Sequence, residues 1–152
     1  MPQGPKGLSV EDATRALLRL GPRLVGRAKR TPVPDELRDL ALAPRHLSML
    51  SYLLMDGPMT VNDLAARLEV APTTVSLMVG DLSRKGVVER REDDDDRRRR
   101  IVSIVPGRQQ AIADWLGRGA SAWRHALEPL TDEQRRVVVE ALRRYDDFTD
   151  GP

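Results

Sequence analysis

The fold of this chain is decided between residues 60 and 105, which have the sequence TVNDLAARLEVAPTTVSLMVGDLSRKGVVERREDDDDRRRRIVSIV. Its first part predicts a helix over residues 60–68, because Thr60 and Asp63 have the spacing of an N-terminal capping pair. A turn at residues 69–71 follows. The apolar positions that recur at helical spacing are Leu64, Ala65 and Leu68.

A second helix is predicted over residues 72–85. Pro72 suits its first turn, where the missing N–H has no partner to lose, and Gly86 suits the left-handed position that ends a helix. Its apolar stripe consists of Val75, Met78, Val79 and Leu82. The side chains between these positions should therefore face outward.

Two β-branched runs follow, at residues 87–88 and 101–105, on either side of the charged segment 89–100. They predict two strands of a hairpin that Pro106 and Gly107 end. Helix, turn, helix and hairpin make a winged helix-turn-helix, so we expect a mainly α fold with a small β-hairpin (α+β). In such a fold the second helix fits a DNA major groove and the hairpin reaches the neighbouring minor groove.

Helices are predicted on both sides of this stretch. Ser9 can cap a first helix, in which Pro22 predicts a kink or a break, and the segment 31–34 stops it. A short helix over about 35–42 and another over 44–56 lead to residue 60.

Two further helices are predicted after the hairpin, with Pro129 between them and a capping box of Thr131 and Gln134. Trp115 and Trp123 fall on one face of the first. We expect them in a dimer core, and ligand clamps are the alternative.

Composition narrows the class of protein. The chain has 152 residues, 40% apolar, 3% aromatic and 32% charged, which suits one helical domain over residues 1–152. It has no cysteine, and the two histidines have no companions at ligand spacing, so we expect no metal and no cofactor. No signal peptide or long apolar run is present, which predicts a cytoplasmic protein without membrane contact.

Several motifs resemble those of the MarR (multiple antibiotic resistance regulator) family. They are Pro72-Thr-Thr-Val75 at the start of the second helix, Arg84-Lys-Gly-Val-Val88 at its exit, and Asp93, Asp96, Arg97 and Arg98 in the hairpin loop. The order of the flanking helices extends the resemblance over nearly the whole chain.

The resemblance implies a homodimeric transcriptional regulator that binds double-stranded DNA. Residues 9–43 and 107–148 would form dimerisation helices, and residues 44–105 the DNA-binding lobe. Many relatives release DNA when a small molecule binds between lobe and dimer region, which implies a ligand-responsive repressor on a pseudo-palindromic operator. An effector would lie between the first helices and residues 112–123. Activation instead of repression stays open.

The candidate DNA-binding residues lie on the second helix and the hairpin. Arg98, with Arg97 beside it, is the candidate for the minor groove. Asp96 would pair with a nearby arginine and orient the wing. The outward side chains of the helix are Thr73, Thr74, Ser76 and Leu77, and the candidate phosphate partners are Arg84, Lys85 and Arg90.

Two alternatives remain. Residues 60–105 carry nine basic and nine acidic side chains, and relatives often have basic residues where this chain has Leu77 and Asp81. These features favour a winged-helix protein-interaction module with lost or weak DNA binding. An enzyme is not expected, because no His–carboxylate pair, Gly-rich phosphate loop or metal constellation is present.

Overall fold

The computed structural model describes residues 7–149, apart from the side chain of Pro44. The chain divides into two compact units, of which the first ends at Val33 and the second begins at Pro34. The described part of the first unit, residues 7–33, contains a single helix, α1 (Val10–Arg30), whose N-terminus is capped as expected, since the Asp12 amide donates to Ser9 Oγ at 3.1 Å.

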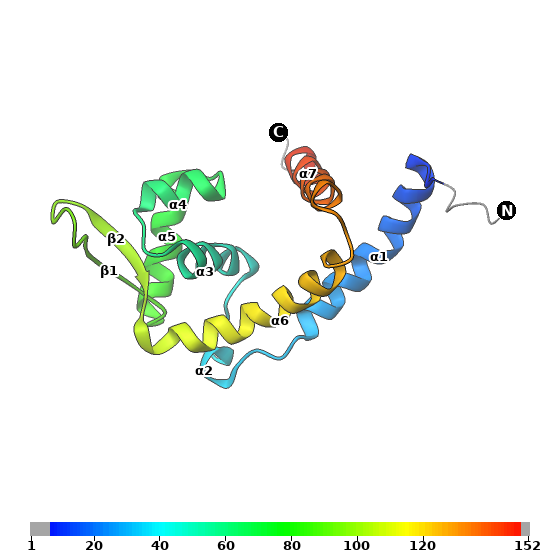
Figure 1. Ribbon diagram of the computed structural model, residues 1–152. Helices are drawn as coiled ribbons and strands as arrows, with labels where there is room; N and C mark the ends of the chain where they lie inside the picture. The colour runs from blue at the N-terminus through cyan, green and yellow to red at the C-terminus, as the bar shows by residue number, and fades with distance from the viewer. Residues whose placement is uncertain (1–6, 150–152) are drawn as a thin grey trace. The chain divides into compact units, whose positions relative to one another are not determined.

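The second unit contains the remaining elements (Figure 1). Its helices are α2 (Asp35–Arg38), α3 (Pro44–Asp56), α4 (Val61–Leu68), α5 (Pro72–Arg84), α6 (Gln109–Leu127) and α7 (Asp132–Thr149), with a 3₁₀ turn η1 (Pro106–Arg108). The strands β1 (Val88–Glu92) and β2 (Arg100–Ile104) form an antiparallel hairpin between α5 and η1. The predicted fold, a mainly helical chain with a winged helix-turn-helix, is confirmed.

Two features of the N-terminal helices differ from the prediction. Of the two alternatives for Pro22, a kink or a break, the break is wrong: α1 continues through Pro22, because the turns on either side outweigh the one hydrogen bond that a proline cannot donate. The helix predicted over about 35–42 ends at Arg38, and Ala41 adopts a left-handed φ of 48° that no α-helix can contain.

The core lies in the lobe formed by α3, α4, α5 and the hairpin. Met49 and Leu50 of α3 are fully buried, and Ile112 at the start of α6 packs in the same unit. Most of the predicted inward residues of α4 and α5 are buried, namely Leu64, Ala65, Val75, Met78, Val79 and Leu82, whereas Leu68 at the end of α4 is only half-buried. Burial of these side chains holds the two helices of the helix-turn-helix together.

The boundaries of the lobe elements follow from local chemistry. Thr60 and Asp63 form the predicted capping box of α4, in which the Asp63 amide donates to Thr60 Oγ1 at 3.1 Å. Gly86 adopts a φ of 68° just after α5, which turns the chain into the hairpin. The strands pair from Val88 opposite Ile104 to Glu92 opposite Arg100.

One contact outside the hairpin ties it to the helices. Met59, just before α4, forms a backbone bridge with Val102 of β2, with hydrogen bonds of 3.2 and 2.8 Å. The middle of β2 is thereby joined to the segment just before α4.

Candidate nucleic-acid interface

The second helix of the helix-turn-helix, α5, has one buried face and one free face. Val75 and Val79 are fully buried, whereas Leu77 is 76% exposed. The other predicted outward residues, Thr73, Thr74 and Ser76, are also exposed. α5 can therefore present three hydroxyls and an isobutyl group to a partner, which are groups that contact base edges, phosphates and thymine methyls.

The cations at the exit of α5 are paired within the helix. Lys85 Nζ lies 3.1 Å from Asp81 Oδ2, and Arg84 Nη2 lies 3.8 Å from Asp81 Oδ1. The hydrogen bond and charge of Lys85 hold the pKa of Asp81 below its usual range. Of the predicted phosphate partners, these two share one carboxylate.

Arg90 lies on β1 and reaches back to the helix. Its Nη2 donates to the backbone oxygen of Ser76 at 3.4 Å. The predicted phosphate partner is therefore held beside the outward face of α5, where Ser76 and Leu77 lie.

In the wing loop, residues 93–99, the contacts of Asp96 differ from the ion pair that was predicted. Asp96 forms no ion pair with an arginine among the residues described. Its Oδ1 instead accepts a hydrogen bond of 3.0 Å from the backbone N–H of Arg98, and its backbone oxygen accepts one of 2.9 Å from Arg99. The carboxylate thus satisfies a backbone donor of the turn, a common role for aspartate in a loop.

Arg97 and Arg98 lie in the turn of this loop and are exposed. Within residues 7–149, neither guanidinium has a hydrogen bond or ion pair with another side chain. Both are available to an external anion, as the prediction for the wing requires.

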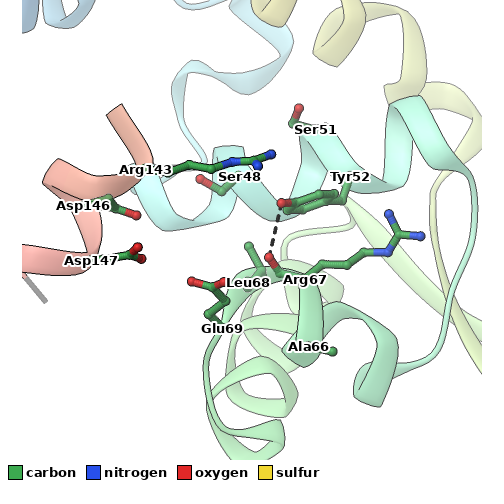
Figure 2. Close-up of a pocket in the computed structure, with 10 residues that line it drawn as sticks. All are labelled: Ser48, Ser51, Tyr52, Ala66, Arg67, Leu68, Glu69, Arg143, Asp146 and Asp147. Carbon is green, nitrogen blue, oxygen red and sulfur yellow. Dashed lines mark hydrogen bonds between the residues drawn. The ribbon is translucent and has the colours of Figure 1, made fainter. Parts of the chain in front are cut away.

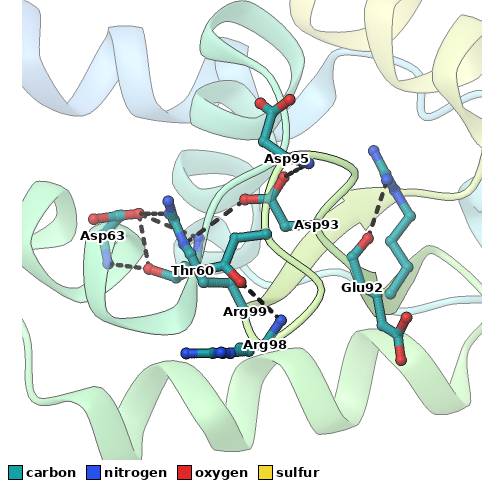
Figure 3. A network of polar contacts seen from close by, with 9 residues as sticks. Thr60, Asp63, Glu92, Asp93, Asp95, Arg98 and Arg99 are labelled. Carbon is teal, nitrogen blue, oxygen red and sulfur yellow. Dashed lines mark hydrogen bonds and ion pairs between the residues drawn. The ribbon is translucent and has the colours of Figure 1, made fainter.

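Arg99 is a residue that the sequence did not single out. It lies between the carboxylates of Asp63 and Asp93, at 3.7 Å from each (Figure 3). Arg99 is one of four consecutive arginines, and nothing in the sequence distinguishes it from the other three. Only the conformation of the loop brings it between the two carboxylates.

His46 of α3 is a second residue whose surroundings the sequence did not predict. It is 2% exposed, and its Nδ1 accepts a hydrogen bond of 3.0 Å from the Ala43 amide. Its Nε2 has no hydrogen-bond partner among the described atoms and lies 3.6 Å from Asp81 Oδ2. Burial lowers the pKa of His46, and Arg45 and Lys85 lower it further against the opposing effect of Asp81.

The depressed pKa of His46 predicts how folding stability depends on pH. The unfolded chain takes up a proton at this residue below about pH 6.5, whereas the folded chain does so only at lower pH. Stability should therefore fall between about pH 7.5 and 5.5. The lowered pKa values of Asp63 and Asp81 act in a more acidic window, below about pH 4.

Urea unfolding of the wild type and of His46→Gln at both pH values measures this effect. Between about pH 7.5 and 5.5 the free energy of unfolding should fall more in the wild type than in the variant. Only the wild type has an imidazole at this position that must lose its proton when the chain folds. His125→Gln, at an exposed histidine of α6, is the matched control. An equal loss in the wild type and in His46→Gln would contradict the prediction.

A cavity of about 830 Å³ lies on another side of the lobe, between α3, the end of α4 and α7 (Figure 2). Tyr52 donates a hydrogen bond of 3.2 Å to the backbone oxygen of Arg67 at its wall, and the Arg67 guanidinium lies 5.8 Å from the centre of the Tyr52 ring. Its other lining residues are Ser48, Ser51, Ala66, Leu68, Glu69, Arg143, Asp146 and Asp147. The cavity thus combines one aromatic ring with charges of both signs.

No group of three or more metal-ligating side chains occurs in the part of the chain that the structure describes. Nor does any helix among residues 7–149 have the length and apolarity needed to cross a membrane.

Comparison with known proteins agrees with this architecture. Residues 42–99 match the family model of the MarR family. No curated protein sequence matches the chain.

Solved structures share the fold over nearly the whole chain. RV1404 from Mycobacterium tuberculosis is 19% identical, with 97% of this chain and 99% of that chain covered and a TM-score of 0.64. A probable transcriptional regulator from Pseudomonas aeruginosa is 23% identical, with 90% and 99% covered and a TM-score of 0.56. A MarR family protein from Bacillus stearothermophilus is 20% identical, with 94% and 99% covered and a TM-score of 0.54.

The family match covers α3, α4, α5, β1 and the wing loop, and the shared fold extends through the flanking helices. Residues 42–99 are thus similar to the MarR family, and nearly the whole chain shares the fold of these solved structures.

Proposed function

We propose that this chain is a ligand-responsive repressor that acts in the cytoplasm as a homodimer on a pseudo-palindromic operator. The observation that supports DNA binding is the exposed face of α5 together with two wing arginines, Arg97 and Arg98, that have no ion pair within residues 7–149. Thr73, Thr74, Ser76 and Leu77 would enter the major groove, and Arg98, with Arg97, the adjacent minor groove. No residue has a catalytic role in this proposal.

Apolar side chains on the flanking helices support the homodimer. On α7, Tyr145 is 71% and Phe148 88% exposed, and no described residue of this helix is buried. Trp123 near the end of α6 is 52% exposed. Surfaces of this kind on a chain of this size mark protein–protein interfaces. The proposed dimerisation helices are residues 9–43 and 107–148, and the proposed DNA-binding lobe is residues 44–105.

A small-molecule effector would control DNA binding in this chain. The expected position is between the first helices and residues 112–123. The cavity beside Tyr52 is an alternative position, and its mixture of an aromatic ring and charges suits a small aromatic molecule with an ionised group.

A protein-interaction module is the second candidate, and the pairing at the exit of α5 favours it. Asp81 neutralises cations that a DNA-binding lobe needs, and Leu77 exposes an apolar side chain that a protein groove could bury. If Asp81 only weakens DNA binding and does not abolish it, removing the charge of Asp81 should raise the affinity for DNA.

The variant Asp81→Asn should therefore bind DNA more tightly than the wild type. Arg84 and Lys85 would become free for phosphates, so the plot of log affinity against log salt should steepen by about one for each cation released. Fluorescence anisotropy titrations at several salt concentrations measure both quantities. Glu89→Gln is the matched control, because it removes an equal charge from an exposed side chain without an ion pair among the described residues. An equal gain in affinity from both substitutions would show that the gain comes from net charge alone and not from the release of Arg84 and Lys85.

Selection of bound duplexes from a random DNA library tests the proposed function. The proposal predicts an enriched pseudo-palindrome whose half-sites are about one helical turn apart. A library that shows no enrichment, with a protein that is folded and dimeric, would favour the interaction module.

A further inference from the structure

Arg99 connects the wing to the helix-turn-helix. Its Nη2 lies 3.7 Å from Asp63 Oδ2 in the first turn of α4, and its Nε lies 3.7 Å from Asp93 Oδ2 at the start of the wing loop. Figure 3 shows the arginine side chain between the two carboxylates. One guanidinium thus joins the two ends of the loop to a helix that lies before it in the sequence.

Both carboxylates are fixed by contacts of their own. Asp63 Oδ2 accepts hydrogen bonds from Thr60 Oγ1 at 2.7 Å and from the Thr60 amide at 3.4 Å. Asp93 is held through its backbone, because its N–H donates to the Arg99 carbonyl at 3.0 Å, and its Oδ1 accepts from the Asp95 amide at 3.1 Å. Arg99 therefore contacts two rigid acceptors.

The other arginines of the run differ from Arg99. Among the described residues, Arg97, Arg98 and Arg100 form no ion pair, although all four side chains are identical and exposed. The structure thus divides the run into one tethered arginine and three free ones.

We propose that Arg99 is a positioning residue, which holds the wing loop against α4 so that Arg97 and Arg98 keep a fixed place relative to α5. This inference rests on the proposed DNA-binding function. Exposed ion pairs contribute little to global stability, so the effect should lie in the order of the loop. A loop that is already ordered loses less entropy when it enters a groove.

The variants Arg99→Gln and Arg100→Gln form a matched pair, because each removes one charge from neighbouring positions. The first readout is ¹⁵N relaxation of the amides of residues 94–98 in the free dimer. In Arg99→Gln the order parameters should fall from about 0.85 to below about 0.6, whereas Arg100→Gln should keep the wild-type values. Arg99→Lys, which keeps the charge, should restore part of the order.

The second readout is affinity for the selected operator. Arg99→Gln should weaken binding about tenfold more than Arg100→Gln, because a mobile loop loses conformational entropy when it becomes ordered on the DNA, and this loss makes the free energy of binding less favourable. Unchanged relaxation in Arg99→Gln would overturn the tether. A mobile loop with affinity equal to that of Arg100→Gln would overturn the positioning role. If the wild type binds no DNA, the proposed function and this role both fail, while relaxation still decides whether the tether exists.

Discussion

Replacing Arg98 by alanine is expected to weaken operator binding roughly a hundredfold, because a dimer loses two arginine contacts of about 1–3 kcal/mol each. Arg98 is exposed at the turn of the wing, and its backbone N–H is fixed by Asp96. The guanidinium is therefore presented by an ordered turn without competition from a neighbouring carboxylate among the residues described. Fluorescence anisotropy with the selected operator measures the loss.

The size of the loss should depend on the DNA that flanks the major-groove contacts. A narrow A·T-rich minor groove has the most negative potential, so the difference between wild type and Arg98→Ala should be largest there. Arg144→Ala, an equal loss of charge at an exposed position of α7, is the control and should bind like the wild type. An unchanged affinity of Arg98→Ala on every flank would refute the assignment of the wing.

The largest expected effect on stability is that of Leu82→Ala. This leucine is fully buried on the inner face of α5. Deleting its side-chain atoms leaves a cavity and should lower the free energy of unfolding by about 2–5 kcal/mol, a large part of the roughly 5–15 kcal/mol that a domain has.

Leu77→Ala is the matched control, because it makes the same chemical deletion on the outer face of the same helix, where the side chain is 76% exposed. It should change stability by less than about 0.5 kcal/mol. If Leu77 contacts a thymine methyl, the variant should also lose its preference for thymine at one position of each half-site. Urea denaturation and a second library selection measure the two effects. Equal destabilisation by both variants would contradict the orientation of α5.

The elements of the lobe could be predicted because their signals are local. The capping box of Thr60 and Asp63, the proline at the start of α5 and the glycine after it each act within one turn of helix. The recurrence of apolar residues every three or four positions then determines which face of the helix is buried, and Val75 and Val79 are buried as predicted. Such signals do not depend on the rest of the chain.

The features that the sequence could not predict depend on contacts between distant residues or on loop conformation. His46 meets Asp81 only because α3 packs in the same lobe as α5, and no spacing in the sequence encodes that contact. Arg99 differs from its neighbours only through the path of the wing loop. The end of α2 at Arg38 has a similar origin, since the chain turns at Ala41 against the helical preference of the segment.

We propose above all that this chain binds DNA in a sequence-specific manner. The most direct test is fluorescence anisotropy of the full chain on DNA from upstream of its own gene, with scrambled competitor, at about 150 mM salt. We predict saturable binding that the competitor does not displace and that Arg98→Ala weakens. Binding no stronger than to the scrambled DNA, even at lower salt, by a folded and inducer-free dimer would contradict the account and direct attention to a protein partner.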